Sequence, residues 1–267
     1  MKKTISILLI STLAVAVALA HEFWLLPSAW FVQPGQLVQI RVRVGEGFTG
    51  ERWEGSVKRI VRFASRLGDQ ETDRLADLKK SGLDSLEVSF AQNGSHLVLL
   101  TTNLSSYHEM EAEKFEDYLV EDGLEHVRAV RRKRGETGKI GRERYRREAA
   151  TLIQVGDMPS PVAFDKTGFD LQIRPEKNPL LADAQKEMAF QIRFMGKKLA
   201  GALIRHWRVD ATGKAIVQMK ITDHKGKVRF QLSPGEQMVS VVHMYPHPLP
   251  AEADWQSVWG NLTFCLR

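Results

Sequence analysis

The chain has 267 residues, of which 43% are hydrophobic, and this is enough for one large or two medium-sized domains with real cores. Its 38 basic and 32 acidic residues leave a formal net charge of +6 at pH 7, which is too small to identify a partner. The single cysteine, Cys265, excludes an internal disulfide framework, so the fold must depend on its core.

Residues 1–20 have the three parts of a secretory signal peptide. Lys2 and Lys3 supply the positive start, residues 5–19 are almost wholly apolar, and Ala18-Leu19-Ala20 fits the small-x-small cleavage rule. Cleavage there leaves a mature chain of 247 residues, 267 minus 20, that begins with His21. No later apolar run approaches the roughly 20 residues that span a bilayer. We therefore expect a periplasmic protein that does not span the membrane after signal cleavage.

Residues 21–108 show the two-residue period of half-buried strands. In residues 37–44, Ile40, Val42 and Val44 alternate with polar residues. Further strands are expected at residues 57–63, 86–90 and 96–101, with Asn93-Gly94 as a hairpin-type turn before the last one. The pattern predicts an antiparallel sheet.

The pattern changes to helical spacing in residues 109–155, which we interpret as a helical excursion. Apolar residues at helical spacing predict a helix in residues 109–119, a second at 124–130 and a third at 142–152, and Gly123 is expected to end the first. The basic cluster in residues 128–134 can attract anionic lipid. It has no interleaved aromatic residues, so we do not expect a nucleic-acid partner.

Residues 158–161, Met-Pro-Ser-Pro, are typical of a linker, and alternation returns beyond them. Short strands with turns between them are expected around residues 169–173, 188–194, 199–209, 228–232, 237–245 and 262–266. The sequence therefore predicts a mainly β chain of two β-sandwich domains of immunoglobulin-like type. The first covers residues 21–160 with the helical insertion, and the second covers residues 161–267.

His21 is the first candidate for chemistry. As a mature N-terminal residue it offers a metal two nitrogens, its free α-amine and its ring. An apolar, strand-like run at residues 23–26 is expected to fix this terminus to the fold, although chain ends normally fray. The alternative is a histidine that is exposed by cleavage and binds nothing.

His243 is the best second candidate among the other histidines. It shares a predicted strand face with Val239 and Val241, where a histidine is more often a hydrogen-bonded core residue than a ligand. Met244 and His247 lie close by and add a thioether and a second imidazole. The remaining histidines include His108, and four others that are more typical of solvated positions: His96, His126, His206 and His224.

The sequence has no His-Glu-x-x-His, no paired cysteines, no Gly-x-Ser-x-Gly and no phosphate-binding loop, so we do not expect an enzyme. Two alternatives to a metal-binding protein stay open. A mature N-terminal histidine with a second imidazole resembles the copper site of oxidative polysaccharide-cleaving enzymes. A sandwich can also serve as a non-catalytic envelope interaction protein.

The chain resembles a family of exported bacterial proteins described as periplasmic components of nickel or cobalt uptake systems, otherwise known as a domain of unknown function. The resemblance covers essentially the whole mature chain. The motifs that carry it lie, in chain order, at residues 20–25, 42–48, 113–119, 122–124, 141–145, 196–202, 242–244, 254–257 and 262–264.

The resemblance implies a β-sandwich protein whose mature N-terminal histidine, His21, is a metal ligand. His243 matches the late His-Met of the family, and Glu109 matches an acidic position just before the helix. Nickel or cobalt, and an inner-membrane metal permease as partner, also follow from the resemblance. Intrinsic affinity of an all-nitrogen site would instead favour copper.

Overall fold

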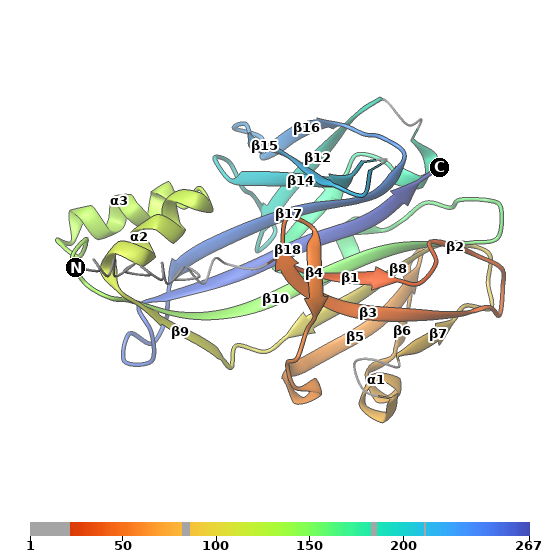
Figure 1. Ribbon diagram of the computed structural model, residues 1–267, viewed down its shortest axis with the longest axis horizontal. Coiled ribbons are helices and arrows are strands. Elements are labelled where there is room, and N and C mark those ends of the chain that lie inside the picture. The colour runs from red at the N-terminus through yellow and green to blue at the C-terminus, as the bar shows by residue number, and fades with distance from the viewer. Residues whose placement is uncertain (1–21, 82–85, 183–185, 211) are drawn as a thin grey trace, which may run out of the picture.

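The computed structural model describes residues 22–81, 86–182, 186–210 and 212–267 (Figure 1). The predicted signal peptide and His21 lie outside the described residues. The described chain is mainly β, as the sequence predicts, and its strands form three sheets, one of ten strands and two of four.

The ten-stranded sheet takes strands from both ends of the chain. Its members are β2 (Phe31–Val32), β5 (Ile60–Leu67), β6 (Gln70–Asp73), β8 (Gly94–Thr102), β9 (Ser106–Met110), β10 (Gly141–Val155), β14 (Leu203–Val209), β15 (Ala215–Ile221), β17 (Gly235–Pro246) and β18 (Trp255–Leu266). The order is β15-β14-β17-β18-β10-β8-β5-β6, with β2 and β9 also paired to β10.

Two smaller sheets flank this one. The first consists of β1 (Glu22–Pro27), β3 (Leu37–Glu46), β4 (Thr49–Arg52) and β7 (Glu87–Ser89). The second consists of β11 (Leu171–Pro175), β12 (Glu187–Phe194), β13 (Lys197–Lys198) and β16 (Lys227–Gln231). In β3, β11 and β16, alternation in the sequence becomes alternation of burial, because successive side chains of a strand point to opposite faces.

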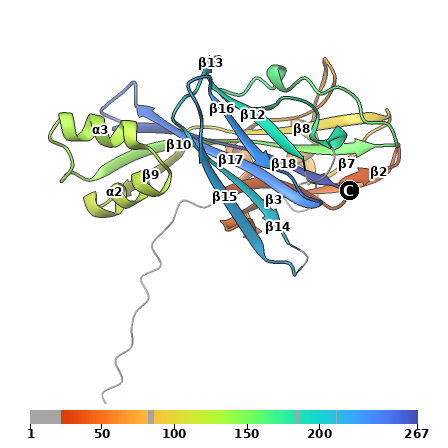
Figure 2. The same ribbon diagram turned by 90° about the horizontal axis from the view of Figure 1, so that it is seen from above.

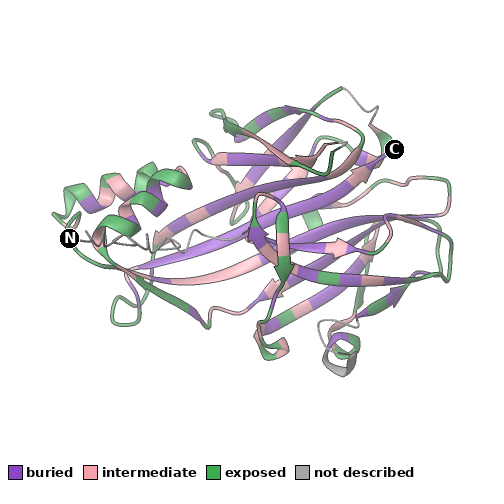
Figure 3. Cartoon of the chain, in the orientation of Figure 1, coloured by how far each residue is buried: buried purple, intermediate pink, exposed green. Residues whose placement is uncertain are grey.

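The ten-stranded sheet is the middle of three β layers. On β8, Leu97 and Leu99 pack in one cluster with Phe190 of β12, whereas Val98 packs in another with Ile40 of β3. Since alternate residues of β8 face different clusters, both faces of this strand are covered, which Figure 3 shows as a mostly purple centre. The core is therefore split between the two sides of one sheet.

The predicted division at residue 160 falls between β10 and the 3-10 helix η2 (Phe164–Lys166). Strands from the two sides of this division pair directly, because β10 runs parallel to β18 from Glu143 opposite Trp255 to Thr151 opposite Thr263. The segments 21–160 and 161–267 thus share the ten-stranded sheet. Their division into two immunoglobulin-like domains stays a prediction.

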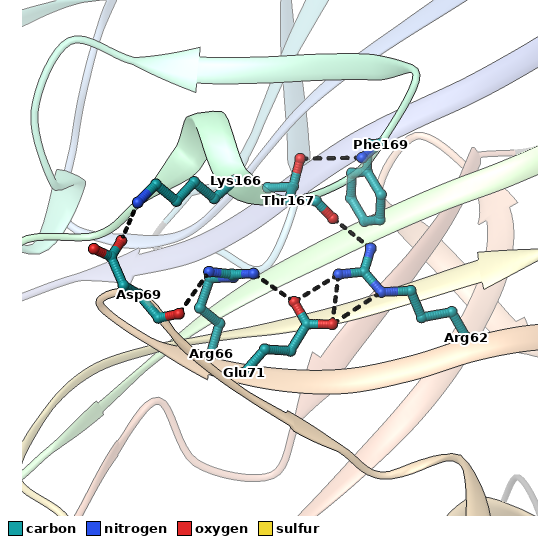
Figure 4. Close-up of polar contacts among 7 residues, drawn as sticks. All are labelled: Arg62, Arg66, Asp69, Glu71, Lys166, Thr167 and Phe169. Atoms are coloured by element: carbon teal, nitrogen blue, oxygen red, sulfur yellow. Dashed lines mark hydrogen bonds and ion pairs between the residues drawn. The ribbon is translucent and has the colours of Figure 1, made fainter.

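Polar contacts also join the β5–β6 hairpin to the segment around η2 (Figure 4). Arg62 pairs with Glu71 at 2.8 Å and donates a further hydrogen bond to the carbonyl of Thr167. Lys166 pairs with Asp69 at 2.7 Å. The two predicted segments therefore touch through side chains as well as through the shared sheet.

The helices that the structure describes are short and lie outside the sheets. α2 (Ala112–Glu121) and α3 (Glu125–Lys133) project together at one end of the molecule (Figures 1 and 2), where Phe115 and Val127 pack on Trp255 and Trp259. The others are α1 (Leu75–Ser81) and the 3-10 helices η1 (Val57–Arg59) and η3 (Pro179–Leu181). Among the described residues, no helix has the length and apolar character to cross a membrane.

The predicted helical excursion, residues 109–155, is only partly helical. Residues 109–110 end strand β9, and residues 142–152, predicted as a helix, lie in the strand β10. The spacing of Tyr145, Ala149 and Leu152 fits a helix locally, but strand pairing on both sides of β10 prevails over local preference. The buried carboxylate of Glu148, unusual in a strand, accepts the backbone N–H of Leu171 at 2.8 Å.

Candidate functional site

Strand β1 begins at Glu22 and is held along its whole length. It pairs antiparallel with β3, and on the other side the carbonyls of Phe23 and Leu25 accept hydrogen bonds from Asn261 and from Thr263, the latter at 2.9 Å. Because β1 is fixed from its first residue, the covalent neighbour of His21 has a defined position in the fold.

The Glu22 carboxylate is buried at this strand end. It accepts hydrogen bonds from the Ser240 hydroxyl at 2.7 Å and from the Trp207 indole at 3.2 Å. Burial raises the pKa of Glu22, against the hydrogen bond from Ser240 and the charge of Arg205, which lower it. Any additional positive charge nearby would stabilise the ionised form of such a buried carboxylate.

Asp122 is a second buried carboxylate near Glu22, at the end of α2. It forms an ion pair with Arg205 at 2.6 Å, yet burial raises the pKa of Asp122 to about 7, and the charge of Glu22 adds to this rise. Arg205 also donates to the carbonyl of Glu121 at 2.7 Å, so α2 is attached to β14 at this point.

Glu143 of β10 is a third buried carboxylate, and it lies under α2. It accepts hydrogen bonds from the Tyr118 hydroxyl at 3.1 Å and from Ser257. Burial raises the pKa of Glu143 to about 7, and the charge of Asp122 contributes to the rise. Glu22, Asp122 and Glu143 are thus electrostatically linked, directly or through Asp122.

A cavity of about 360 Å³ opens beside Glu22 and Asp122. Its charged lining has one cation, Arg205, against four carboxylates, namely those of Glu22, Glu46, Glu121 and Asp122. The excess of negative charge makes this cavity favourable for a cation.

The structure places His243 on β17 in an aromatic cluster. Its ring stacks on that of His126 of α3, with centroids 5.1 Å apart, and lies 4.4 Å from the ring of Phe194. Burial lowers the pKa of His243 to about 4, and the charge of His126 lowers it further. His126 is itself hydrogen-bonded through Nε2 to the carbonyl of Met244 at 2.7 Å.

His243 and Glu22 contact opposite faces of β17. Ser240, which binds Glu22, is three residues from His243 on a regularly paired strand, and an odd separation puts two side chains on opposite faces. The structure therefore brings His243 to His126 and Phe194 and does not bring it to the start of β1. The joint site of His21 and His243 stays a prediction, since His21 lies outside the described residues.

Glu109 is exposed on β9, where it pairs with Arg142 of β10 and accepts a hydrogen bond from the Tyr107 hydroxyl at 2.9 Å. Within the described part of the chain, no three or more His, Cys, Asp or Glu side chains come together as a group that could hold a metal ion. Sequence reasoning did not single out Glu22, Asp122 or Glu143. All three nevertheless lie in motifs of the family resemblance, at residues 20–25, 122–124 and 141–145.

Comparison with known proteins identifies a family but no activity. The model of a family described as a domain of unknown function (DUF4198) matches residues 18–245, and this description names neither a catalytic activity nor a metal. No curated protein matches the chain. Among solved structures, the D0-D1 domain of Intimin is 10% identical and covers 91% of this chain and 97% of its own, with a TM-score of 0.21 that is too low to support an argument.

Proposed function

The chain belongs to the DUF4198 family of unknown function, and we propose that it is an exported protein that binds a transition-metal ion through its mature N-terminal histidine. One observation supports this above all. β1 is fixed from Glu22 onward, so removal of residues 1–20 would leave a single residue, His21, between the free amine and a hydrogen-bonded strand. A chain end that is already held by a strand loses less conformational entropy when it binds a metal ion than a frayed chain end does.

The surroundings of the strand end favour a cation. Glu22 and Asp122 are buried and line a cavity with more carboxylates than cations, and burial raises the pKa of both. A bound metal ion would stabilise their charged forms, so binding is expected to release protons. The amine and ring of His21 would supply nitrogen donors, and a nearby carboxylate would supply oxygen.

The donor types narrow the choice of metal. Mixed nitrogen and oxygen donors suit Ni²⁺ and Cu²⁺, and Cu²⁺ has the higher intrinsic affinity. Nickel or cobalt is the choice that the family resemblance implies. On this basis we propose a role in nickel or cobalt uptake or buffering, with an inner-membrane permease as the partner that receives the metal. His243 and Glu109 remain the further ligands to be tested.

The proposal is tested with two forms of the protein that differ only at the terminus. One begins at His21 and the other carries an additional alanine before His21, which acylates the α-amine and prevents it from binding. Calorimetric titration with Ni²⁺, Co²⁺, Cu²⁺ and Zn²⁺ is expected to show that the extended form binds at least about tenfold more weakly, because one ligand is lost.

Equal affinity of the two forms would rule out the terminal chelate. His224→Ala is the matched control, because His224 is exposed in a turn and its loss should leave the affinity unchanged. His243→Ala and Glu109→Ala decide the further ligands, since only a true ligand should change the affinity without changing the thermal midpoint of unfolding in the absence of metal.

A further inference from the structure

A continuous stack of cations and aromatic rings lies on the face of β1 opposite to Glu22. The guanidinium of Arg59 lies 5.4 Å from the centre of the Trp53 ring, and Trp53 meets Phe23 edge to face at 5.2 Å. The guanidinium of Arg147 follows, 4.9 Å from the ring of Phe23. Phe23 and Glu22 are successive residues of a strand, so this stack and the carboxylate-lined cavity are on different sides of β1.

The stack continues along β10 to β9. The guanidinium of Arg147 also lies 5.1 Å from the centre of the Tyr145 ring. The His108 ring packs against Tyr145 as well, with the two ring centres 5.0 Å apart. His108 is exposed, and Tyr145 and Arg147 are half-buried, so this end of the stack is open to solvent.

Within the described ranges of the chain, the two arginines of the stack have no carboxylate as an ion-pair partner. The Nε atoms of Arg59 and Arg147 are buried and have no hydrogen-bond partner among the described residues. The two more deeply buried arginines have partners of different kinds: Arg205 pairs with the carboxylate of Asp122 at 2.6 Å, and Arg131 donates to the backbone carbonyl of Lys139 at 2.7 Å.

The carboxylates nearest to Arg147 are bound to other groups. Glu143 accepts hydrogen bonds from Tyr118 and Ser257, and Glu22 accepts them from Ser240 and Trp207. Both act on Arg147 through their charge alone. A guanidinium whose Nε–H is buried without a partner is destabilising, and an anion from solution that accepts from the group would lower that cost.

The electrostatics of the neighbours agree with a positive potential. Although His108 as a whole is exposed, packing of its ring on Tyr145 removes part of the solvent from the imidazole and lowers the pKa of His108, and the charges of Arg147 and Arg59 lower it further. Burial likewise lowers the pKa of Arg147, and the charge of Arg59 lowers it further. The charges of the two guanidinium groups therefore reach each other and the His108 imidazole.

We propose that Arg59, Arg147 and His108 form a binding site for a small oxyanion that carries a carboxylate or phosphate group. Stacking on Trp53, Phe23 and Tyr145 covers the faces of the two guanidinium groups and leaves the N–H groups at their edges free. Such an edge donates two parallel hydrogen bonds to a carboxylate or phosphate. This site uses none of the proposed metal ligands, so it is independent of the proposed function.

The test uses the protein that begins at His21, freed of metal with a chelator and dialysed, so that the anion cannot bind through a metal ion. Citrate and inorganic phosphate are titrated separately by calorimetry, at constant ionic strength set with chloride. We expect saturable binding of at least one of them. Arg59→Gln and Arg147→Gln should each weaken it about tenfold or more, since each removes charge-assisted hydrogen bonds. Citrate alone would indicate a carboxylate ligand, and comparable binding of both would indicate a general oxyanion site.

Arg134→Gln is the matched control. The guanidinium of Arg134 also lies over an aromatic ring, that of Trp255 at 6.0 Å, but Arg134 is at the C-terminal end of α3 and is not part of the stack. This variant removes the same charge and should bind citrate and phosphate as the unaltered protein does. The proposal is wrong if neither anion binds saturably, or if Arg134→Gln weakens binding as much as Arg59→Gln. Arg147→Lys keeps the positive charge but loses the two parallel N–H donors of the guanidinium, so this variant should bind the anion more weakly than the unaltered protein does. Should Arg147→Gln not fold, Arg59→Gln decides the outcome, because Arg59 lies at the more peripheral end of the stack.

Discussion

Four carboxylates are buried in the described part of this protein, those of Glu22, Asp122, Glu143 and Glu148, and we expect them to make its stability depend on pH. Glu22, Asp122 and Glu143 all have pKa values raised by burial. A carboxylate whose folded pKa exceeds its unfolded value binds its proton more tightly in the folded state. Its contribution to stability is therefore largest below the unfolded pKa and is lost as the pH rises through the folded one.

Glu143→Gln isolates this effect at one position. The amide oxygen can still accept hydrogen bonds from Tyr118 and Ser257, but the side chain no longer ionises. Because the pKa of Glu143 rises from 4.5 to about 7 on folding, the unaltered protein should lose about 2–3 kcal/mol relative to the variant between pH 5 and pH 8.

The measurement is urea unfolding of both proteins at the two pH values. Any cost of the amide N–H₂ group in the variant is the same at both pH values and cancels in the comparison. A free-energy difference between the two proteins that stays constant from pH 5 to pH 8 would contradict a raised pKa for Glu143.

Only those features of the candidate site that depend on neighbouring residues in the chain could be predicted from the sequence. The strand-like run after His21 correctly predicted a fixed β1, because a short continuous apolar run is typical of a strand that is buried on both faces. The approach of Asp122 to this strand end, and of Glu143 to Asp122, depends on how α2 and β10 pack, and no periodicity reports that. The place of His243, opposite to Ser240 on β17, follows from parity along the strand, but which face meets Glu22 does not.

At the scale of elements, the two-residue period predicted strands well and the helical period failed once. β3, β12 and β17 lie where alternation predicts them, because each has one face on a core cluster. In β10, residues 142–147 are almost all charged and show no alternation of hydrophobicity, so the sequence resembles a solvated helix face. Pairing with β18 and β9 and the arginine contacts of this segment are long-range, and they are absent from any local window.

Gly123 and Gly135 allow a comparison between two helix ends. Both follow a helix with positive φ, +65° and +64°, but a Cβ on Gly123 would lie 2.5 Å from Cβ of Leu203, whereas Gly135 has open space. Alanine at either position costs about 1 kcal/mol for the left-handed backbone. Gly123→Ala should cost about 1–2 kcal/mol more, because the α2–α3 pair must shift away from β14.

Thermal unfolding of the two variants, compared with the unaltered protein, tests the expectation. Equal effects at both glycines would mean that the helical pair does not press on β14 at Leu203. The comparison also bears on the candidate site, since Asp122, which contacts Arg205, directly precedes Gly123.

At the scale of the whole molecule, the shared sheet determines how the chain should unfold. β10 from the first predicted segment and β18 from the second are parallel neighbours over residues 143–151 and 255–263. Separating the segments would expose a long unpaired edge on each, and it would break the ion pair of Lys166 with Asp69 and the hydrogen bond from Arg62 to the carbonyl of Thr167. The two predicted sandwiches should therefore unfold together, although each has its own side of the core.

Tryptophan positions make this testable. Trp53 packs on Phe23 and Arg59 of the first segment and so reports that segment. The other five tryptophans contact residues of both segments, as Trp255 and Trp259 do through Phe115. Phenylalanine replacement of these five gives a protein whose fluorescence follows the first segment, and far-ultraviolet circular dichroism follows both segments. We expect the fluorescence midpoint in urea to coincide with that of circular dichroism measured on the same variant, as for one cooperative unit. A fluorescence midpoint that differs from the circular-dichroism midpoint would contradict this expectation. It would mean that one segment unfolds while the other stays folded, so that the parallel pairing of β10 with β18 contributes little to stability.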